Sequence, residues 1–382
     1  MRRYICTLGA VCATAALTLS ACGTADHPDT ATPSSYAEVR NILQRLTTAD
    51  GAPGVLIEVR DAHGRTVLTS GVANLETRAP IAADSRFRIG SMTKMFVATV
   101  VLQLVGEHRV ALDAPVEQYL PGVLRNGGQG VTARQLLQHT GGLPDYLDYL
   151  SVEQVLKDPL THHDPLELVN LALDQQPSFP PGTGWAYSNT DYLLAGLLIE
   201  KVTGRPYADA IDQRIIRPLG LRDTSVPGDE PSIAGNHPRG YHRMGGADPV
   251  DISEFNPSVA GAAGGMISSA TDLNQFLDAL LNGRLLGQPE LQAMMTTRPT
   301  GNSFDDAYGL GLQSTPLPCG GRYWGHDGGI PGFQTMGVIT TDGRSATVMT
   351  NLYPGESDAQ DADIRAVLAT ALCAAAPAKP GA

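Results

Sequence analysis

The sequence predicts an α/β (α+β) fold, in which an antiparallel sheet built from the N- and C-terminal segments is flanked by helices. Strand-like runs lie near both ends of the 382-residue chain, whereas the middle alternates helical stretches with loops rich in Pro and Gly. One sheet covered by helices, with a mainly helical domain inserted, is the simplest arrangement for this order. We expect one domain over 36–376, with an α/β part at about 36–107 and 256–376 and a helical part at about 108–255.

The composition is that of an acidic globular protein. Lys and Arg total 27 and Asp and Glu total 39, so the formal net charge is −12, and hydrophobic residues make up 42%. Because no basic surface offsets this charge, we expect no nucleic-acid partner.

The N-terminus has the pattern of an export signal. Two arginines precede a charge-free apolar run from Ile5 to Leu19, which is shorter than the roughly 20 residues of a membrane span. Leu19-Ser20-Ala21-Cys22 resembles the lipobox of bacterial lipoproteins, so we expect a signal peptide at 1–21, lipid on Cys22 and a flexible tether at 22–35. The alternative is an ordinary signal peptide. The protein would be exported, and either secreted or held at the outer face of the cell membrane by the lipid alone.

Two cysteines remain after the predicted signal peptide and the lipid site. Cys319 and Cys373 form an even pair in an oxidising compartment, which favours one disulfide. The alternative is two separate buried thiols.

The first predicted elements are a hairpin, an extended segment and a buried helix. Strand-forming runs at Val55–Arg60 and Thr66–Ser70 flank a polar turn. Arg86–Gly90 is extended until its glycine. From Ser91 the sequence is apolar nearly all round to Val105, which predicts a buried helix.

The later elements follow the same patterns. Helices are expected at 132–139, 165–174 and 191–203, and again at 362–376. Strands are expected at 308–313, 321–325, 333–340 and 345–351.

Ser91 and Lys94 form a chemical pattern at the start of the predicted buried helix. Ser91 stands where strand gives way to helix, near backbone N–H groups that suit a developing oxyanion. Lys94 follows one turn later among apolar residues, where a desolvated amine loses proton affinity and can take the proton of a serine hydroxyl. The alternative is a serine that caps the helix and a lysine that reaches solvent.

Two further segments place polar groups where a cleft could form. Tyr187 and Asn189 stand two apart in a loop, where a phenol could share proton transfer and an amide could bind a carbonyl. The alternative is a core tyrosine and an asparagine that caps a helix. Later, His326 and its neighbouring glycines lie on a predicted strand, whose edge could accept a substrate backbone. The alternative here is a hairpin turn.

Together these segments resemble the three motifs of a known enzyme family. Ser-x-x-Lys at 91–94, Tyr-x-Asn at 187–189 and His-x-Gly at 326–328 look like those of penicillin-recognising serine hydrolases of the class C β-lactamase type. Within that group the chain most resembles secreted D-alanyl-D-alanine carboxypeptidases, from about Tyr36 to Cys373. The resemblance implies a β-lactamase/DD-peptidase-like fold, and the two cysteines fall where such carboxypeptidases carry a bridge.

The resemblance also implies roles for individual residues. Ser91 would be the acylated nucleophile, Lys94 and Tyr187 would move its proton, and His326 would keep that pair aligned. Asn189 would hold the acyl-side amide of the substrate, and the N–H groups of Ser91 and Gly329 would form the oxyanion hole. No metal and no cofactor is implied.

The substrate side departs from the carboxypeptidase pattern around Gln313 and 327–329. Gln313 stands where an arginine is expected to hold the substrate carboxylate, and Gly329 follows Gly328 where a threonine is expected. Asp327 adds negative charge beside that place. A carboxylate there would lose a charge-assisted pair, so the acyl-enzyme machinery is better supported than the leaving group.

The sequence therefore predicts a serine hydrolase that acts through an acyl-enzyme. The first hypothesis is a monomeric carboxypeptidase-like penicillin-binding enzyme for cell-wall peptides, with β-lactams as inhibitors or substrates. The same machinery could serve an esterase or amidase of small acyl substrates, or a β-lactamase. A non-catalytic binding protein that keeps the pocket is a more remote alternative.

Overall fold

The computed structural model describes residues 36–126, 128–243, 248–355 and 358–374. The expected signal peptide, the tether and Cys22 lie outside the described residues, so export and lipid anchoring stay predictions. Within the described part, none of the helices is both long and apolar enough to span a bilayer.

The central element is an eight-stranded sheet with the order β2-β1-β12-β11-β10-β9-β8-β7. Its strands are β1 Gly54–Asp61, β2 Gly64–Gly71, β7 Arg298–Pro299, β8 Ala307–Tyr308, β9 Gln313–Pro316, β10 Arg322–Ile330, β11 Phe333–Thr340 and β12 Ser345–Thr350. Strand β1 pairs antiparallel with β12, with Val55 opposite Thr350. The two ends of the chain thus meet in one antiparallel sheet, which confirms the predicted fold class.

Helices occupy most of the chain between these strands. They are α1 Ala37–Thr48, α2 Thr93–Gly106, α3 Ala133–Gln138, α4 Val152–Lys157, α5 Pro165–Leu173, α6 Asn189–Thr203, α7 Tyr207–Ile211, α8 Arg217–Leu219, α9 Gly261–Gly264, α10 Ala270–Leu281, α11 Gln288–Met295 and α12 Asp358–Ala374. Two short strand pairs join them: β3 Arg86–Arg88 with β6 Ile267–Ser269, and β4 Tyr241–His242 with β5 Val250–Asp251.

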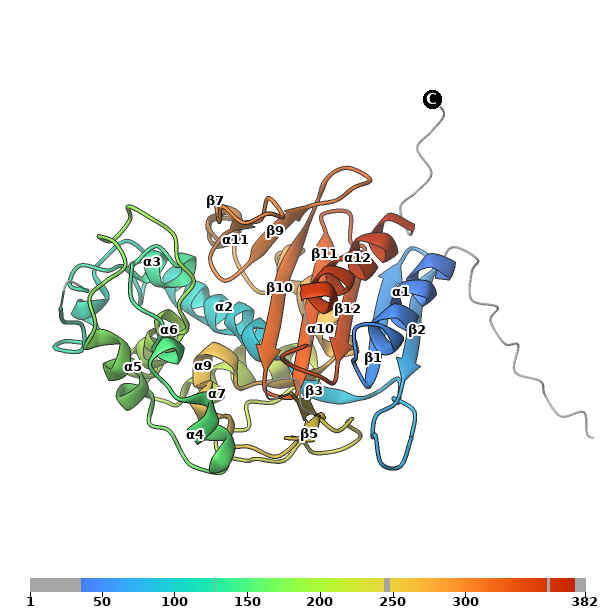
Figure 1. Cartoon of the computed structure of the whole chain (residues 1–382). Coiled ribbons are helices and arrows are strands. Elements are labelled where there is room, and N and C mark those ends of the chain that lie inside the picture. Colours follow the sequence, from blue (N-terminus) through green and yellow to red (C-terminus); the bar gives the residue numbers. More distant parts are fainter. Residues whose placement is uncertain (1–35, 127, 244–247, 356–357, 375–382) are drawn as a thin grey trace, which may run out of the picture. The chain divides into compact units, whose positions relative to one another are not determined.

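The sheet is buried on both faces because its strands alternate between two apolar cores. In β1, Val55, Ile57 and Val59 pack in one core with residues of α1 and α12, whereas Leu56 packs in the other core. This is the period of two expected of a strand. Figure 1 shows α1 and α12 side by side over one face of the sheet, while α10 packs against β11 and β12.

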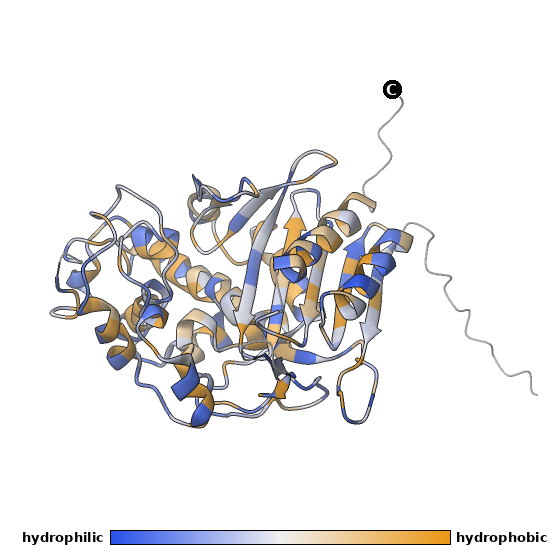
Figure 2. Ribbon diagram, viewed as in Figure 1, coloured by the Kyte–Doolittle hydropathy of each residue, from blue (hydrophilic) through white to orange (hydrophobic). Residues whose placement is uncertain are grey.

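Helices α1 and α2 differ in how they are buried. In α1 the buried residues are Val39, Ile42, Leu43 and Leu46, which form one stripe. The other side of α1 is hydrophilic, as the blue residues of this helix show (Figure 2). Nearly all of α2 is buried, because it packs against α6, α9 and α11. The predicted all-round apolar helix is therefore an internal one.

One predicted strand is wrong. The run 308–313 reads as a single strand, but the structure places Tyr308 at the end of β8 and Gln313 at the start of β9. Between them Gly311 has a left-handed φ of 74° and donates its N–H to the carbonyl of Leu137. The glycines turn the chain away from the ladder, and this brings Tyr308 and Gln313 opposite each other.

A disulfide joins Cys319, in the turn between β9 and β10, to Cys373 in α12. The bridge closes a segment of 54 residues. It ties the C-terminal helix to the strand pair that carries Gln313 and Asp327.

Candidate active site

Ser91 lies in a 3-10 turn, Gly90–Met92, directly before α2. Gly90 has a left-handed φ of 51°, and a Cβ on it would lie 2.9 Å from the backbone nitrogen of Gly329 in β10. Only glycine therefore lets this turn pack so closely against β10. The result is a half-buried serine hydroxyl next to the strand that carries the third motif.

Lys94 lies one turn after Ser91 and has 0% exposed surface. Its Nζ is 3.0 Å from Ser91 Oγ, and donates to Asn189 Oδ1 at 2.7 Å and to the Ala263 carbonyl at 2.8 Å. Burial lowers the pKa of Lys94 to about 7, against the opposing charges of Asp145, Asp327 and Asp191. A substantial fraction of this amine is therefore neutral near pH 7.

The hydrogen-bond partners of Lys94 fit the neutral amine. A neutral amine has two N–H donors and one lone pair. The ammonium form donates to Ser91 Oγ as well as to Asn189 and Ala263, and on loss of one proton the oxygens of Asn189 and Ala263 keep the two remaining N–H groups while the lone pair faces Ser91 Oγ. Lys94 is thus placed to take the proton of Ser91.

Tyr187 completes the hydrogen bonds of the serine. Its Oη donates to Ser91 Oγ at 2.7 Å, from the loop that precedes α6. Burial, with a further contribution from the charge of Asp327, raises the pKa of Tyr187 well above its usual value. The residue is therefore a phenol near neutral pH, which suits a donor better than a base.

Asn189 holds the lysine in position. It is the first residue of α6, and its Nδ2 donates to Asp145 Oδ2 at 2.7 Å while its Oδ1 accepts from Lys94. The sequence assigned this amide to the substrate. In the structure the amide of Asn189 also bridges Lys94 and the carboxylate of Asp145, and Asn189 still lines the pocket.

His326 contacts Tyr308 instead of the serine. Its Nδ1 is 2.6 Å from the backbone carbonyl of Asp327, so Nδ1 carries a proton, and its Nε2 is 2.8 Å from Tyr308 Oη. Its ring centre is 6.3 Å from that of Tyr187. The predicted alignment of Tyr187 and Lys94 by His326 would act through packing and Tyr308.

Gly328 and Gly329 let β10 approach the serine turn. A Cβ on Gly328 would lie 2.1 Å from the carbonyl of Ile89, and one on Gly329 would lie 2.5 Å from the ring of Tyr353. Any side chain here would push the strand away. Gly90, the neighbour of Ser91, thus packs against the backbone of Gly329, and the oxyanion hole of Ser91 and Gly329 stays a prediction.

Asp327 and Gln313 form the polar wall of the pocket. Gln313 Nε2 donates to Asp327 Oδ1 at 2.9 Å, which turns Gln313 Oε1 the other way. That oxygen is buried and has no hydrogen-bond partner among the described residues. Burial alone would raise the pKa of Asp327, but its hydrogen bonds with His326 and Gln313 and the charge of Arg365 hold that pKa well below its usual value. The carboxylate is therefore charged at neutral pH.

One pocket of about 640 Å³ is lined by Ser91, Tyr187, Asn189, Gln313, Asp327 and Gly329, whereas Lys94, His326 and Gly328 are not part of its lining. Its wall also includes apolar groups: Tyr146, Leu147, Leu150, Val155, Trp185, Val259, Ile330 and Pro331. A small set of polar groups in an apolar cleft is typical of a small-molecule site.

Four neighbours of the site were not singled out from the sequence. Asp145 holds Asn189, Tyr308 contacts His326, and Asp306 and Arg365 line the pocket. Arg365 comes from α12, which is far along the chain. The disulfide is the one signal that could have found it, since Cys373 follows Arg365 by about two helical turns.

His139 also lies behind the site. It ends α3 in a left-handed conformation, and its Nδ1 is 2.8 Å from Asp191 Oδ2. Burial lowers the pKa of His139 and raises that of Asp191. Its ring centre is 4.5 Å from that of Tyr187, so this pair supports the tyrosine from behind.

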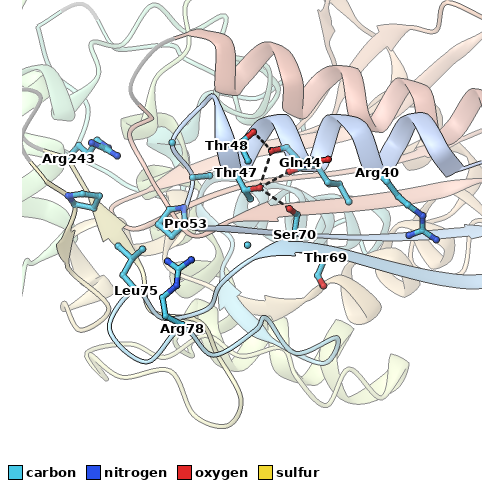
Figure 3. A pocket seen from close by; sticks show the side chains of 15 residues that line it. Arg40, Gln44, Thr47, Thr48, Pro53, Thr69, Ser70, Leu75, Arg78 and Arg243 are labelled. Atoms are coloured by element: carbon cyan, nitrogen blue, oxygen red, sulfur yellow. Dashed lines mark hydrogen bonds between the residues drawn. The ribbon is translucent and has the colours of Figure 1, made fainter.

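A second cavity lies between α1 and the β2 edge of the sheet (Figure 3). It has hydroxyls, with Thr47 and Ser70 joined at 2.8 Å, and the arginines Arg40, Arg78 and Arg243. Among the described residues of its lining there is no lysine, histidine or carboxylate that could activate a hydroxyl. Among the described residues, no group of three or more His, Cys, Asp or Glu side chains is arranged to hold a metal ion.

Comparisons with known proteins agree with this geometry. Residues 39–371 match the family model described as "Beta-lactamase". A D-stereospecific amidohydrolase from Streptomyces sp. is 40% identical, with a TM-score of 0.79, and the match covers 85% of this chain and 96% of that one. A D-amino acid amidase from Ochrobactrum anthropi SV3 is 30% identical, with a TM-score of 0.78, over 90% of this chain and 98% of that one. Penicillin-binding protein 4* of Bacillus subtilis is 29% identical over 78% of this chain and 67% of its own length.

Proposed function

The chain belongs to the beta-lactamase family of serine hydrolases, and we propose that it hydrolyses amides of small D-amino acids that carry a free ammonium group. Peptide and amide substrates and β-lactams fit this family. The D-configuration follows the names of the two solved structures above, both of which match nearly their whole length.

The proposed reaction starts with neutral Lys94. Lys94 takes the proton of Ser91 while Oγ forms a bond to the amide carbon, and the N–H groups of Ser91 and Gly329 stabilise the oxyanion. The carbon–nitrogen bond then breaks, and the leaving nitrogen receives the proton from Lys94. In the second half, Lys94, neutral again, takes a proton from a water whose oxygen bonds to the acyl carbon. The bond between that carbon and Ser91 Oγ then breaks, the acid leaves, and Ser91 Oγ takes the proton from Lys94.

The charge of the pocket wall supports a substrate that carries an ammonium group. Asp327 lines the pocket with a carboxylate that is charged at neutral pH, and Gln313 Nε2 donates to its Oδ1. A carboxylate suits an N–H donor with positive charge, and it opposes a second carboxylate. This favours an amidase over the carboxypeptidase that the sequence put first.

The apolar wall supports a bulky acyl side chain. Leu147, Leu150 and Trp185 lie on the same pocket as Ser91. Burial of an aromatic side chain there would contribute about 1.5–3 kcal/mol to binding. An amide such as D-phenylalaninamide combines this group with the ammonium.

A panel of purified substrates tests the proposal. We expect kcat/KM for D-phenylalaninamide to exceed that for 3-phenylpropanamide, which lacks the ammonium, by at least about tenfold, because a hydrogen bond to a charged group contributes about 1.5–3 kcal/mol. We also expect D-phenylalaninamide to exceed its L-enantiomer.

The same panel includes the alternatives. A peptide ending in D-Ala-D-Ala tests the carboxypeptidase, a nitrophenyl ester the esterase and a chromogenic cephalosporin the β-lactamase. A higher kcat/KM for the D-Ala-D-Ala peptide than for D-phenylalaninamide would overturn the proposal.

A further inference from the structure

Arg365 reaches the active-site pocket from the C-terminal helix α12. We propose that Arg365, clamped between Asp306 and Asp327, sets which substrate charge the pocket accepts. This inference rests on the proposed function for the kind of substrate, but its test depends only on relative rates. We call these three residues the charge array.

The geometry fixes the guanidinium within the array. Arg365 Nη1 donates to Asp306 Oδ2 at 3.2 Å, and Nη2 lies 3.8 Å from Asp327 Oδ2. The guanidinium carbon also lies 4.4 Å from the ring centre of Phe304. With 18% of its side chain exposed, Arg365 has little freedom to turn towards a substrate.

Asp306 is the anchor of the array. Its side chain is 3% exposed and accepts hydrogen bonds from Asn302 Nδ2 at 2.8 Å and from Thr315 Oγ1. Asp327 is 47% exposed and faces the pocket. Arg365 therefore neutralises the buried carboxylate first, and the exposed one keeps most of its charge.

The charges explain how a pocket with an arginine can still reject a carboxylate. Two carboxylates and one guanidinium leave a net charge of minus one. A substrate carboxylate would have to displace Asp306 or Asp327 from Arg365, whereas an ammonium meets the exposed carboxylate of Asp327 directly. Arg365 is thus a carboxylate-binding group that its own neighbours mask.

Neutralising Asp306 and Asp327 should make the guanidinium of Arg365 available to a substrate carboxylate. Asp306→Asn brings the array to zero charge, and Asp306→Asn combined with Asp327→Asn brings it to plus one. Arg365→Gln brings it to minus two, and Arg365→Lys keeps it at minus one. Asp305→Asn is the matched control, because Asp305 is the exposed neighbour of Asp306, does not line the pocket, and has a left-handed φ of 53° that asparagine tolerates.

The experiment measures kcat/KM for three amides that share one phenylpropanoyl skeleton and carry an ammonium, a hydrogen or a carboxylate at the α-carbon. A second series places the same charges on the leaving amine. In either series, the double variant should shift the ammonium-to-carboxylate ratio towards carboxylate by at least about tenfold relative to the wild type, the size expected for one charge-assisted contact. Arg365→Gln should shift it the other way, while Arg365→Lys and Asp305→Asn should leave it within about twofold.

The outcomes separate this inference from the proposed function. If the wild type prefers the neutral amide but the variants shift the ratio as described, the proposed substrate is wrong and the charge array stands. If the ratio stays constant in both series for the double variant and for Arg365→Gln, the array does not select charge. Circular dichroism of each variant identifies any that fails to fold. If the double variant fails to fold, the ratio measured for Arg365→Gln still decides the test.

Discussion

A Ser91→Ala enzyme is expected to lose hydrolysis of every substrate by at least about 10⁴-fold, because no other group can form the acyl-enzyme. The hydroxyl of Ser91 is the point where the hydrogen bonds of Lys94 and Tyr187 meet, at 3.0 and 2.7 Å. The substitution removes one oxygen atom from a half-buried turn, so folding should be preserved.

Mass spectrometry after incubation with a labelled penicillin checks this result. The wild type should gain one covalent adduct on the peptide that contains Ser91, and Ser91→Ala should gain none. An adduct of equal yield in the variant would place the nucleophile elsewhere. Thr47→Ala is a matched control, since Thr47 also has a hydroxyl in a cavity, but the described lining of that cavity has no lysine, histidine or carboxylate.

Replacing Lys94 is expected to have the second largest effect. Lys94→Met fills the same buried space with an apolar chain of similar length, so the protein should fold, but acylation should fall by about 10²–10⁴-fold, as for the loss of a general base. Lys94→Arg should be similarly inactive although it keeps the charge, because a guanidinium does not release its proton near neutral pH.

The measurement for Lys94 is the single-turnover rate of acylation. Comparing Lys94→Met with Lys94→Arg separates the role of Lys94 in proton transfer from the effect of its positive charge. Near-normal acylation by Lys94→Arg would mean that the residue acts as a fixed cation and that another group takes the proton of Ser91.

The sequence predicted best what local patterns determine. The strand-forming run of β1 and the nearly all-round apolar run of α2 were visible in the residue order, and the spacing of Ser91 and Lys94 placed both on one helical turn. The boundaries of the strand at 333–340 agree with β11. Each of these features depends on residues within a few positions of one another.

The meeting of the three motifs in one site came from the family resemblance, whereas the meeting of the two ends of the chain in one sheet came from the order of the predicted elements. Tyr187 contacts Ser91 across 96 positions, and no local period could predict that contact. The run 308–313 was assigned as one strand because its residues favour a strand, and the left-handed Gly311 broke it. The tertiary contact of Gly311 with Leu137 decided the outcome.

Arg365 shows the limit most clearly. The missing arginine at position 313 pointed to a pocket without positive charge, yet α12 supplies one from 52 positions further along the chain. Its partner Asp306 lies in a loop whose sequence has no recognisable motif. The net charge of a pocket depends on which charged residues the fold brings together, and the sequence alone does not show which ones meet.

The central claim is that a buried amine is neutral enough near pH 7 to take the proton of Ser91. The pH dependence of the acylation rate constant tests this most directly, from about pH 5.5 to about pH 9. Because only the neutral amine accepts a proton, the rate should rise with pH, with a midpoint near the pKa of about 7. Asp145 raises that pKa through its charge, so Asp145→Asn should move the midpoint to lower pH. A rate independent of pH over this range, or a midpoint that moves upward in Asp145→Asn, would contradict the account.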